Sequence, residues 1–330
     1  MTTTLLACSK PFSRTKEIEY CFKQLPYCEG WMMGSCHVQH PARSCSAYEV
    51  FDREHTSHWL FAGSWLEWDR VMRLWSQLTF VSKTIQSISP VFAAYEPILP
   101  DMKWVACGNR FIGLTKKRST TPYMSMLSQD KPPRFEHLVQ LTGFLRLFQH
   151  QTKHLVFVNR DIKTIDILDG AHDLVAAVKK YIPKLQVFCE WETFYLKNTY
   201  DIAASRSTDL SLSFGSYVTS CLAYSEQGAL LIDYPFFLEV NIEDIDLCEM
   251  LYAFLDFSAF DRQYLIDLYY NMEVPSHFFS LLAYHHMTKI LEVIADDDIG
   301  ACERSVMLEQ LKKMARSYDL FRAQVPSWYV

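Results

Sequence analysis

The period at which apolar residues recur changes along the chain, and this change constrains the fold more than any other feature. Within residues 46–51, Tyr48 and Val50 alternate with polar neighbours, as a half-buried strand requires. Residues 58–62 can pair with that strand as a hairpin, and further strand candidates follow at residues 104–107 and 110–113. Elsewhere apolar side chains return every three or four positions, as in helices packed on a core; this holds for residues 65–78, 135–151, 171–181, 244–257, 262–270 and 278–294. The sequence therefore predicts an α+β fold that is strand-rich at the start and helical afterwards.

Composition and charge limit the classes of function that the chain can serve. Of its 330 residues, 49% are hydrophobic and 15% are aromatic, which is enough to fill a substantial core. The net charge of −6 and the lack of any long basic run argue against nucleic acid as a partner. No run of about 18 apolar residues occurs, which argues against a membrane-spanning helix. The ten cysteines are scattered without a C-x-x-C pair, which indicates reduced thiols and a cytoplasmic location.

The most specific pattern lies past the middle of the chain. Residues 213–234 read as a glycine turn at Gly215, a short loop, an apolar strand, a second turn and a strand that ends in the tripeptide Ile-Asp-Tyr. This layout resembles the catalytic core of the aminoglycoside phosphotransferase and choline kinase family. The resemblance implies a two-lobed protein-kinase-like fold, with a small strand-rich lobe and N-terminal extension over residues 1–115 and a larger helical lobe over residues 116–330.

The catalytic groups of that family map onto three positions of this sequence. The family loop usually reads His-Gly-Asp, with an Asn five residues after the Asp, and an Ile-Asp strand follows. The loop Asp corresponds here to Ser216, the Asn to Cys221 and the strand-end Asp to Asp233. In the family the loop Asp orients or deprotonates the attacking hydroxyl, while the Asn and the second Asp hold magnesium on the nucleotide phosphates. The resemblance therefore implies a degenerate member that keeps one metal-binding carboxylate. Asp246, followed by Leu-Cys, resembles the first residue of the Asp-Leu-Ala helix of the family.

The small lobe of that family also supplies a lysine that holds the nucleotide phosphates. The resemblance places it on the strand before the helix, where residues 60–62 fall, and Glu67 would be its usual helix partner. No lysine occurs between Lys23 and Lys83, so this cation is missing unless Arg53 or a residue from elsewhere replaces it. Without the lysine, an ordinary solvated face is the favoured interpretation of Glu67.

A glycine-rich phosphate loop is equally incomplete. Residues 29–34 contain Gly30 and Gly34, but a tryptophan and two methionines stand between them. Side chains of that size obstruct the close approach of a phosphate to the backbone.

Residues 158–168 offer a rival catalytic loop that looks like the His-Arg-Asp loop of protein kinases. Asp161 would be the base, and Asp166 would stand in the Asn position. A protein kinase needs a second metal-binding Asp roughly twenty residues later, and that interval offers none on a strand; Asp233 is too far along the chain. A helix or strand edge with solvated charges is the favoured alternative for this segment.

Five potential zinc ligands stand close together near the start of the chain, and zinc sites are built from four such nitrogen or sulfur donors. Their spacing matches no familiar finger or ribbon, so buried cysteines and surface histidines are the favoured interpretation. These residues are Cys28, Cys36, His37, His40 and Cys45.

The function that these features favour is that of a pseudokinase, a binding or regulatory module that holds a protein partner or a small ligand in the interlobe cleft. The missing base and lysine are the reason, because each contributes a large factor to phosphoryl transfer. No cofactor is assigned to this form. The alternative is an active ATP- and magnesium-dependent small-molecule phosphotransferase, in which Asp161, Asp209 or Asp246 supplies the second carboxylate. A third interpretation is an interaction protein that resembles a kinase by chance.

Overall fold

A computed structural model describes most of the chain, and the described residues fall into two compact units. The first unit comprises Met1–Thr121 and Cys221–Phe237, and the second comprises Pro122–Ser220 and Leu238–Val330. The sequence analysis places one boundary near residue 115, whereas the chain leaves the first unit and later returns to it. The described residues are 14–25, 28–39, 46–93, 97–107, 110–118, 120–122, 135–158, 167–182, 190–205, 210–215, 218, 222–225, 229–232, 238–253 and 258–329.

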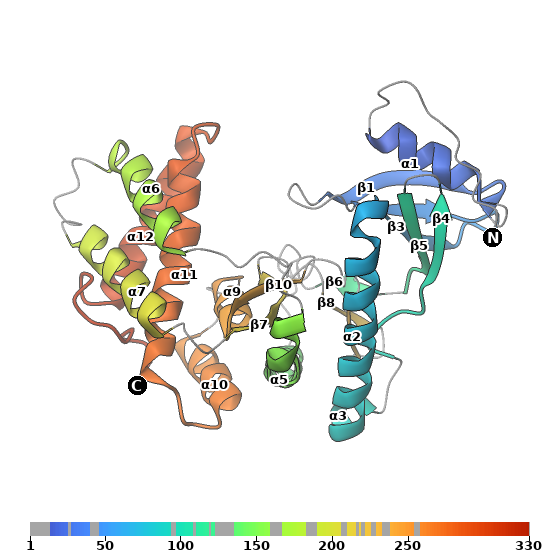
Figure 1. The fold of residues 1–330 in the computed structure, drawn as a ribbon. Coiled ribbons are helices and arrows are strands. Elements are labelled where there is room, and N and C mark those ends of the chain that lie inside the picture. The colour runs from blue at the N-terminus through green and yellow to red at the C-terminus, as the bar shows by residue number, and fades with distance from the viewer. Residues whose placement is uncertain are drawn as a thin grey trace. The chain divides into compact units, whose positions relative to one another are not determined.

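The first unit is built on an antiparallel five-stranded sheet (Figure 1). Its strand order is β1-β2-β3-β5-β4, and the β2–β3 hairpin is the one that the alternating pattern predicts. The strands are β1 (Met32–Gln39), β2 (Ser46–Phe51), β3 (Ser57–Ser64), β4 (Lys103–Cys107) and β5 (Arg110–Lys116). The helices are α1 (Arg14–Lys23), the 3-10 turn η2 (Trp65–Glu67), α2 (Trp68–Ile88) and α3 (Pro90–Ala93).

Each face of this sheet is covered by a helix. Residues directly opposite each other on paired strands share a face, so the register assigns side chains to one helix or the other. On the α2 face, Trp68 and Trp75 of α2 contact Trp104 of β4, with ring centroids 5.8 and 6.0 Å apart. On the opposite face, a buried cluster joins α1 to the sheet; its members include Ile18, Phe22, Tyr48, Val50, Leu60, Ala62, Ile112 and Leu114.

The α2 face requires a glycine at residue 113, and this yields a stability prediction. A Cβ atom there would lie 2.6 Å from Cζ3 of Trp104, whose ring is held by α2. Gly113→Ala is therefore expected to destabilise the first unit by about 1–3 kcal/mol, because the close-packed ring cannot withdraw without strain. Gly143→Ala in α5 is the matched control. No atom lies within 4 Å of the added Cβ, and alanine stabilises a helix interior by up to about 1 kcal/mol relative to glycine. Urea unfolding of both variants checks the opposite signs, and equal stabilities would contradict the packing argument.

The returning segment adds a second, smaller sheet to the first unit. Strands β8 (Leu222–Ser225) and β9 (Leu230–Ile232) pair antiparallel, and β6 (Thr120–Pro122) completes the order β6-β8-β9. Five of the six paired residues are less than 3% exposed, so the hairpin belongs to a core.

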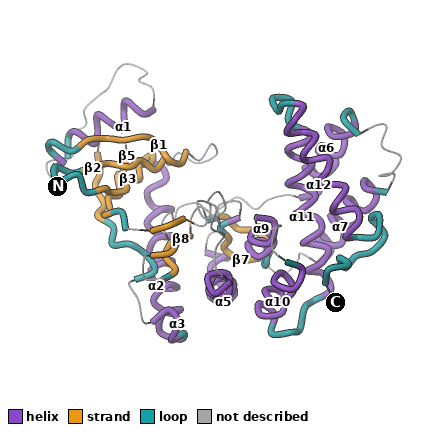
Figure 2. Tube along the Cα trace, turned by 180° about the vertical axis from the view of Figure 1, so that it is seen from behind, coloured by secondary structure: helices purple, strands orange, loops and turns teal. Residues whose placement is uncertain are grey.

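The second unit is mainly helical (Figure 2). Helix α11 is its centre: 13 of its 20 residues are buried, and α6, α7, α9 and α12 pack around it. Only one short antiparallel pair, β7 with β10, is found among the described residues of this unit. The elements are α5 (Phe135–Thr152), η3 (Lys153–Val158), α6 (Ile167–Lys179), α7 (Trp191–Ser205), β7 (Leu210–Ser213), β10 (Glu239–Ile242), α9 (Ile245–Ala253), α10 (Ala259–Tyr270), α11 (Ser276–Ala295) and α12 (Ala301–Ser317).

The C-terminal segment folds back onto the second unit. Tyr329 donates its hydroxyl to Asp267 Oδ1 at 2.7 Å, and its ring lies 4.8 Å from that of Phe279. The guanidinium of Arg262 lies 4.2 Å above the ring of Trp328, a cation–π contact. The two aromatic residues near the C-terminus are thus partly buried against α10 and α11.

The observed α+β architecture confirms the fold class, and the differences have physical causes. Helix α12 was not predicted, because it buries only Leu311, Met314 and Ala315 and so lacks a continuous apolar face. Gly34 lies inside β1, where an added Cβ would be 2.9 Å from the Glu49 carbonyl oxygen, so strand packing explains this glycine. No helix in the described part of the chain is long and apolar enough to cross a bilayer.

Candidate functional site

The candidate site is the turn that follows β7 in the second unit. Strand β7 pairs with β10, with Ser213 opposite Glu239, and Phe214 directly after it is fully buried. The Phe214 ring lies 4.9 Å from that of Phe148 on α5, which fixes the end of the strand. Gly215 then takes a φ of +54°, a left-handed conformation that favours glycine. The chain is thus turned sharply at the point where the family loop begins.

A buried carboxylate holds this turn in place. Asp246, in the first turn of α9, is fully buried, and its Oδ1 accepts hydrogen bonds from Ser213 Oγ and Gly215 N, both at 2.7 Å. Its Oδ2 accepts from Phe214 N at 3.1 Å. The charge also lies at the positive end of the α9 dipole. Since both oxygens are occupied by donors from the turn, Asp246 does not fit the role of a relocated magnesium ligand.

A second buried carboxylate lies two residues before Asp246. Asp244 has a φ of +72° and accepts a hydrogen bond from the Tyr269 hydroxyl at 2.9 Å. Burial raises the pKa of Asp244 to about 6, although the hydrogen bonds from Tyr269 and Tyr270 act in the opposite direction. Burial therefore disfavours the ionised form of this carboxyl, which precedes the anchor of the turn by two residues.

One turn further along α9, a buried ionic cluster ties this helix to α11. Glu249 Oε2 lies 2.7 Å from His285 Nε2 and 3.1 Å from Lys289 Nζ. Burial by itself raises the pKa of Glu249. The hydrogen bonds and positive charges of His285 and Lys289 outweigh burial, so the pKa of Glu249 is lowered. The adjacent His286 faces the Cys248 carbonyl oxygen at 3.3 Å, and burial lowers the pKa of this ring to about 3. Each ring of the histidine pair therefore has a polar partner.

The hairpin in the first unit leads directly to Asp233, and one arginine anchors it. Arg118 donates from Nη2 to the Ile232 carbonyl oxygen at 3.1 Å and to that of Ile98 at 3.0 Å, and from Nη1 to that of Pro97 at 2.6 Å. The sequence analysis missed Arg118, because nothing in the local pattern relates it to a strand more than a hundred residues away.

The predicted site residues fall largely outside the described part of the chain. This applies to Ser216, Cys221 and Asp233, to Asp161 of the rival loop, and to Asp209. Glu67 is the last residue of the 3-10 turn η2, directly before α2, whereas the sequence predicts a helix that already begins at residue 65. The side chain of Glu67 is not among those described. The catalytic, cofactor-binding and metal-binding roles assigned to these residues stay predictions. Among the residues the structure does describe, no three His, Cys, Asp or Glu side chains are grouped as a metal site requires.

The strand on which the resemblance places the lysine is β3. Of residues 60–62, Leu60 and Ala62 belong to the cluster that packs on α1, so Phe61 is the one that faces α2. The register agrees, because Phe61 pairs with Gly113, which Trp104 covers from the α2 side. Phe61 is 3% exposed. Of the three residues of β3 among which the resemblance places the lysine, the one that faces α2 is therefore apolar.

Two cations near this sheet already have partners. Lys117 Nζ lies 2.8 Å from Glu49 Oε1 and 4.7 Å from the ring centroid of Trp59, which precedes Phe61 on the same face. Arg53 lies in the β2–β3 turn, where its Nε donates to the Glu29 carbonyl oxygen at 2.7 Å. Arg53 is thus tied to the turn that carries Glu29, and this contact does not support it as a replacement for the lysine.

Cys28 is a core residue of the first unit. It is 3% exposed in the cluster beneath α1, and burial raises the pKa of its thiol to about 11. Burial thus disfavours the thiolate, which is the form of cysteine that binds zinc. The side chains of Cys36 and His37 and the whole of His40 and Cys45 lie outside the described residues.

Comparisons with known proteins identify the fold. No protein-family model matches the sequence, and no curated protein is significantly similar to it. Many solved structures resemble the chain, including a spectinomycin phosphotransferase in complex with ADP and spectinomycin, with a TM-score of 0.55, 12% identity, and coverage of 96% of this chain and 97% of the other. An aminoglycoside phosphotransferase from Alicyclobacillus acidocaldarius has a TM-score of 0.55 and 11% identity, with coverage of 90% and 91%. A choline/ethanolamine kinase family protein from Mesorhizobium loti has a TM-score of 0.51 and 8% identity, with coverage of 94% and 98%. The chain therefore has the two-lobed, protein-kinase-like fold of the aminoglycoside phosphotransferases and choline kinases.

Proposed function

We propose that this phosphotransferase-like protein is catalytically degenerate and acts as a binding or regulatory module. The observation that carries the proposal is the buried Phe61 on the α2 face of the sheet. Phosphoryl transfer depends on positioned charges that neutralise the phosphate oxygens. A phenyl ring offers no charge and no hydrogen bond to a phosphate, so this position supplies no clamp.

Two further features support the loss of activity. Lys117, on the same face, already has its charge balanced by Glu49, and moving it to a phosphate would break a 2.8 Å ion pair. In the loop after Gly215, the residue corresponding to the base is Ser216, whose hydroxyl is too weak a base to accept a proton at neutral pH. The absence of both the clamp and the base favours a protein that binds without transferring a phosphoryl group.

One observation favours the alternative, an active ATP- and magnesium-dependent phosphotransferase. The turn at Gly215 keeps a full set of hydrogen bonds to the buried Asp246, although a chain released from catalysis has no need to hold that turn. In this alternative Asp233 would hold one magnesium ion, and a carboxylate such as Asp161 or Asp209 would complete the site.

Nucleotide-dependent thermal stability tests the proposal. The chain is expected to show a change in Tm below about 1 °C with 5 mM ATP and magnesium. An intact site with a Kd near 50 μM would gain about 2.7 kcal/mol at that concentration, which corresponds to a rise in Tm of roughly 4 °C for a chain of this size. The spectinomycin phosphotransferase, whose structure contains ADP, is the positive control for the assay.

The same thermal-stability measurement distinguishes the degenerate protein from an active ATP- and magnesium-dependent phosphotransferase. A large magnesium-dependent shift that disappears in Asp233→Ala would support an active site with Asp233 as a metal ligand. It would overturn the proposal if radiolabelled ATP were also consumed by the native chain at a rate that Asp233→Ala abolishes.

A further inference from the structure

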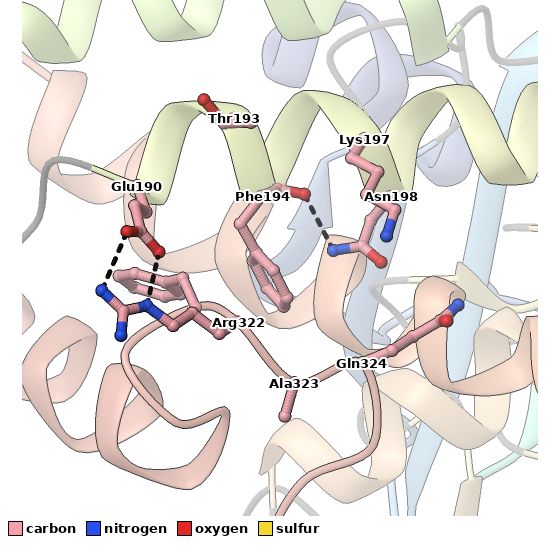
Figure 3. Close-up of a pocket in the computed structure, with 9 residues that line it drawn as sticks. Glu190, Thr193, Phe194, Lys197, Asn198, Arg322, Ala323 and Gln324 are labelled. Atoms are coloured by element: carbon pink, nitrogen blue, oxygen red, sulfur yellow. Dashed lines mark hydrogen bonds and ion pairs between the residues drawn. The ribbon is translucent and has the colours of Figure 1, made fainter.

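A hollow in the second unit lies apart from the candidate turn (Figure 3). It has a volume of about 180 Å³ and is formed between the first turns of α7 and the segment that follows α12. Phe194 and Phe321 give it apolar walls, and Ala323 lines it between them and Gln324. None of its lining residues comes from β7, β10 or α9.

A buried amide faces this hollow with one group unused. Asn198 is 2% exposed, and its Nδ2 donates to the Phe194 carbonyl oxygen at 2.9 Å. Among the residues the structure describes, no donor reaches Asn198 Oδ1. Figure 3 shows this oxygen on the side of the amide group away from the bond to Phe194. This oxygen is not one of the fully buried side-chain atoms that lack a partner, so at the hollow it is open to an N–H or O–H group of a ligand.

A cation and a second amide accompany Asn198. Lys197 lines the hollow, and within the described part of the chain it forms no ion pair. Gln324 donates Nε2 to Ser280 Oγ, which leaves its Oε1 as a further acceptor. On the rim, Arg322 and Glu190 bind each other through two hydrogen bonds of 3.1 Å, so their charges cancel. The net charge of the lining is therefore positive, and Lys197 is its source.

The backbone next to the hollow is strained. Asp319, Leu320 and Phe321 take φ values of 48°, 54° and 69°, three left-handed residues in succession without a glycine. Such stretches persist only where the surroundings hold them, and they concentrate at ligand clamps and active sites. The strain ends at Phe321, which forms one wall of the hollow.

We propose that this hollow is a binding site for a small, ring-shaped monoanion that also carries an N–H or O–H donor. The volume sets the size, because a cavity of about 150 Å³ holds a benzene molecule, and one of about 180 Å³ holds a ring with one or two small substituents. The ring packs on Phe194 and Phe321, the anion pairs with Lys197, and the donor binds Asn198 Oδ1. This site is independent of the function proposed for the candidate turn.

Three related probes test each part of this assignment by calorimetry. 3-Hydroxybenzoate carries ring, charge and donor and is expected to bind with a Kd of about 0.1–1 mM, as a ligand of ten non-hydrogen atoms can. Benzoate lacks the donor, and 3-hydroxybenzamide lacks the charge, so each is expected to bind about 5-fold more weakly or worse. Lys197→Met is expected to weaken 3-hydroxybenzoate about 5- to 10-fold and to leave 3-hydroxybenzamide unchanged. Lys313→Met on the exposed side of α12 is the matched control and should change neither.

The methyl resonance of Ala323 locates the binding independently of affinity. In a sample with ¹³C-labelled alanine methyl groups, this signal, assigned with Ala323→Ser, should shift and saturate with the same Kd as the calorimetry. Absence of saturable binding up to about 10 mM would overturn the proposal. It would be overturned equally if Lys197→Met weakened the acid and the amide alike, or if binding left the Ala323 signal unmoved.

Discussion

Asp246→Ala is expected to destabilise the second unit by about 3–5 kcal/mol, the largest loss predicted for this chain. The substitution leaves Ser213 Oγ and the amides of Phe214 and Gly215 buried without an acceptor, and each such group costs about 1–3 kcal/mol. Part of this loss is offset because a buried charge is removed as well. Urea unfolding, read by far-ultraviolet circular dichroism, measures the difference.

The local nature of the loss distinguishes this prediction from a general packing defect. Hydrogen exchange in peptides that contain Phe214 and Gly215 should accelerate more than exchange in α11, because the turn loses its acceptor first. Asp246→Asn should be milder, since the amide oxygen still accepts from one side of the turn. Asp173→Ala on the exposed face of α6 is the control and should stay within about 0.5 kcal/mol of the native chain. Uniform acceleration throughout the unit would argue against Asp246 as the specific anchor.

Asp244→Asn is expected to stabilise the protein at pH 8 by about 2–3 kcal/mol. The pKa of Asp244 rises from 3.8 in the unfolded chain to about 6 in the folded one, so ionisation is penalised only after folding. Below pH 3.8 the Asp244 carboxyl is neutral in both states, so the native chain keeps its full stability there. The native chain loses free energy of unfolding as the pH rises through 6. Asparagine stays neutral throughout, accepts from Tyr269 as the acid does, and tolerates the left-handed backbone at this residue.

The pH dependence of the difference is the measurement that checks it. Urea unfolding of both proteins at pH 4.5, 6 and 8 should give curves that converge at the acidic end and separate at the basic end. Asp201→Asn, on the exposed face of α7, controls for the loss of one negative charge and should not change the slope. A variant less stable than the native chain at pH 8 would mean that Tyr269 stabilises the ionised carboxylate enough to offset its burial.

Local patterns predicted the elements that bury one clear face. The alternation of Tyr48 and Val50 placed β2 correctly, and the apolar repeat of α11 identified the centre of the helical unit. Helix α7 was not predicted, because the polar residues Asn198 and Thr199 are buried in it and interrupt its apolar face. Asn198 Nδ2 and Thr199 Oγ1 donate to carbonyl oxygens one turn earlier, which the sequence pattern does not reveal.

At the candidate site, the sequence predicted where α9 begins and not the contacts of its first carboxylate. The resemblance placed Asp246 at the start of a helix, and the structure adds the three groups of the turn that it binds. The apolar residue at the lysine position could not be identified from the strand alone, because a strand of eight residues presents alternate side chains to opposite faces. The packing of Leu60 and Ala62 on α1, together with the pairing of Phe61 with Gly113, decides which face carries the phenyl ring.

The discontinuous first unit has a consequence for synthesis on the ribosome. The hairpin β8–β9 belongs to this unit, yet residues 122–220 are translated before it. At about 5–20 residues per second, the apolar surface that receives the hairpin waits roughly 5–20 s for its partner strands. During that interval the nascent chain presents an unfilled core to chaperones and to neighbouring chains, so slowing of translation between residues 122 and 220 is expected to increase its aggregation.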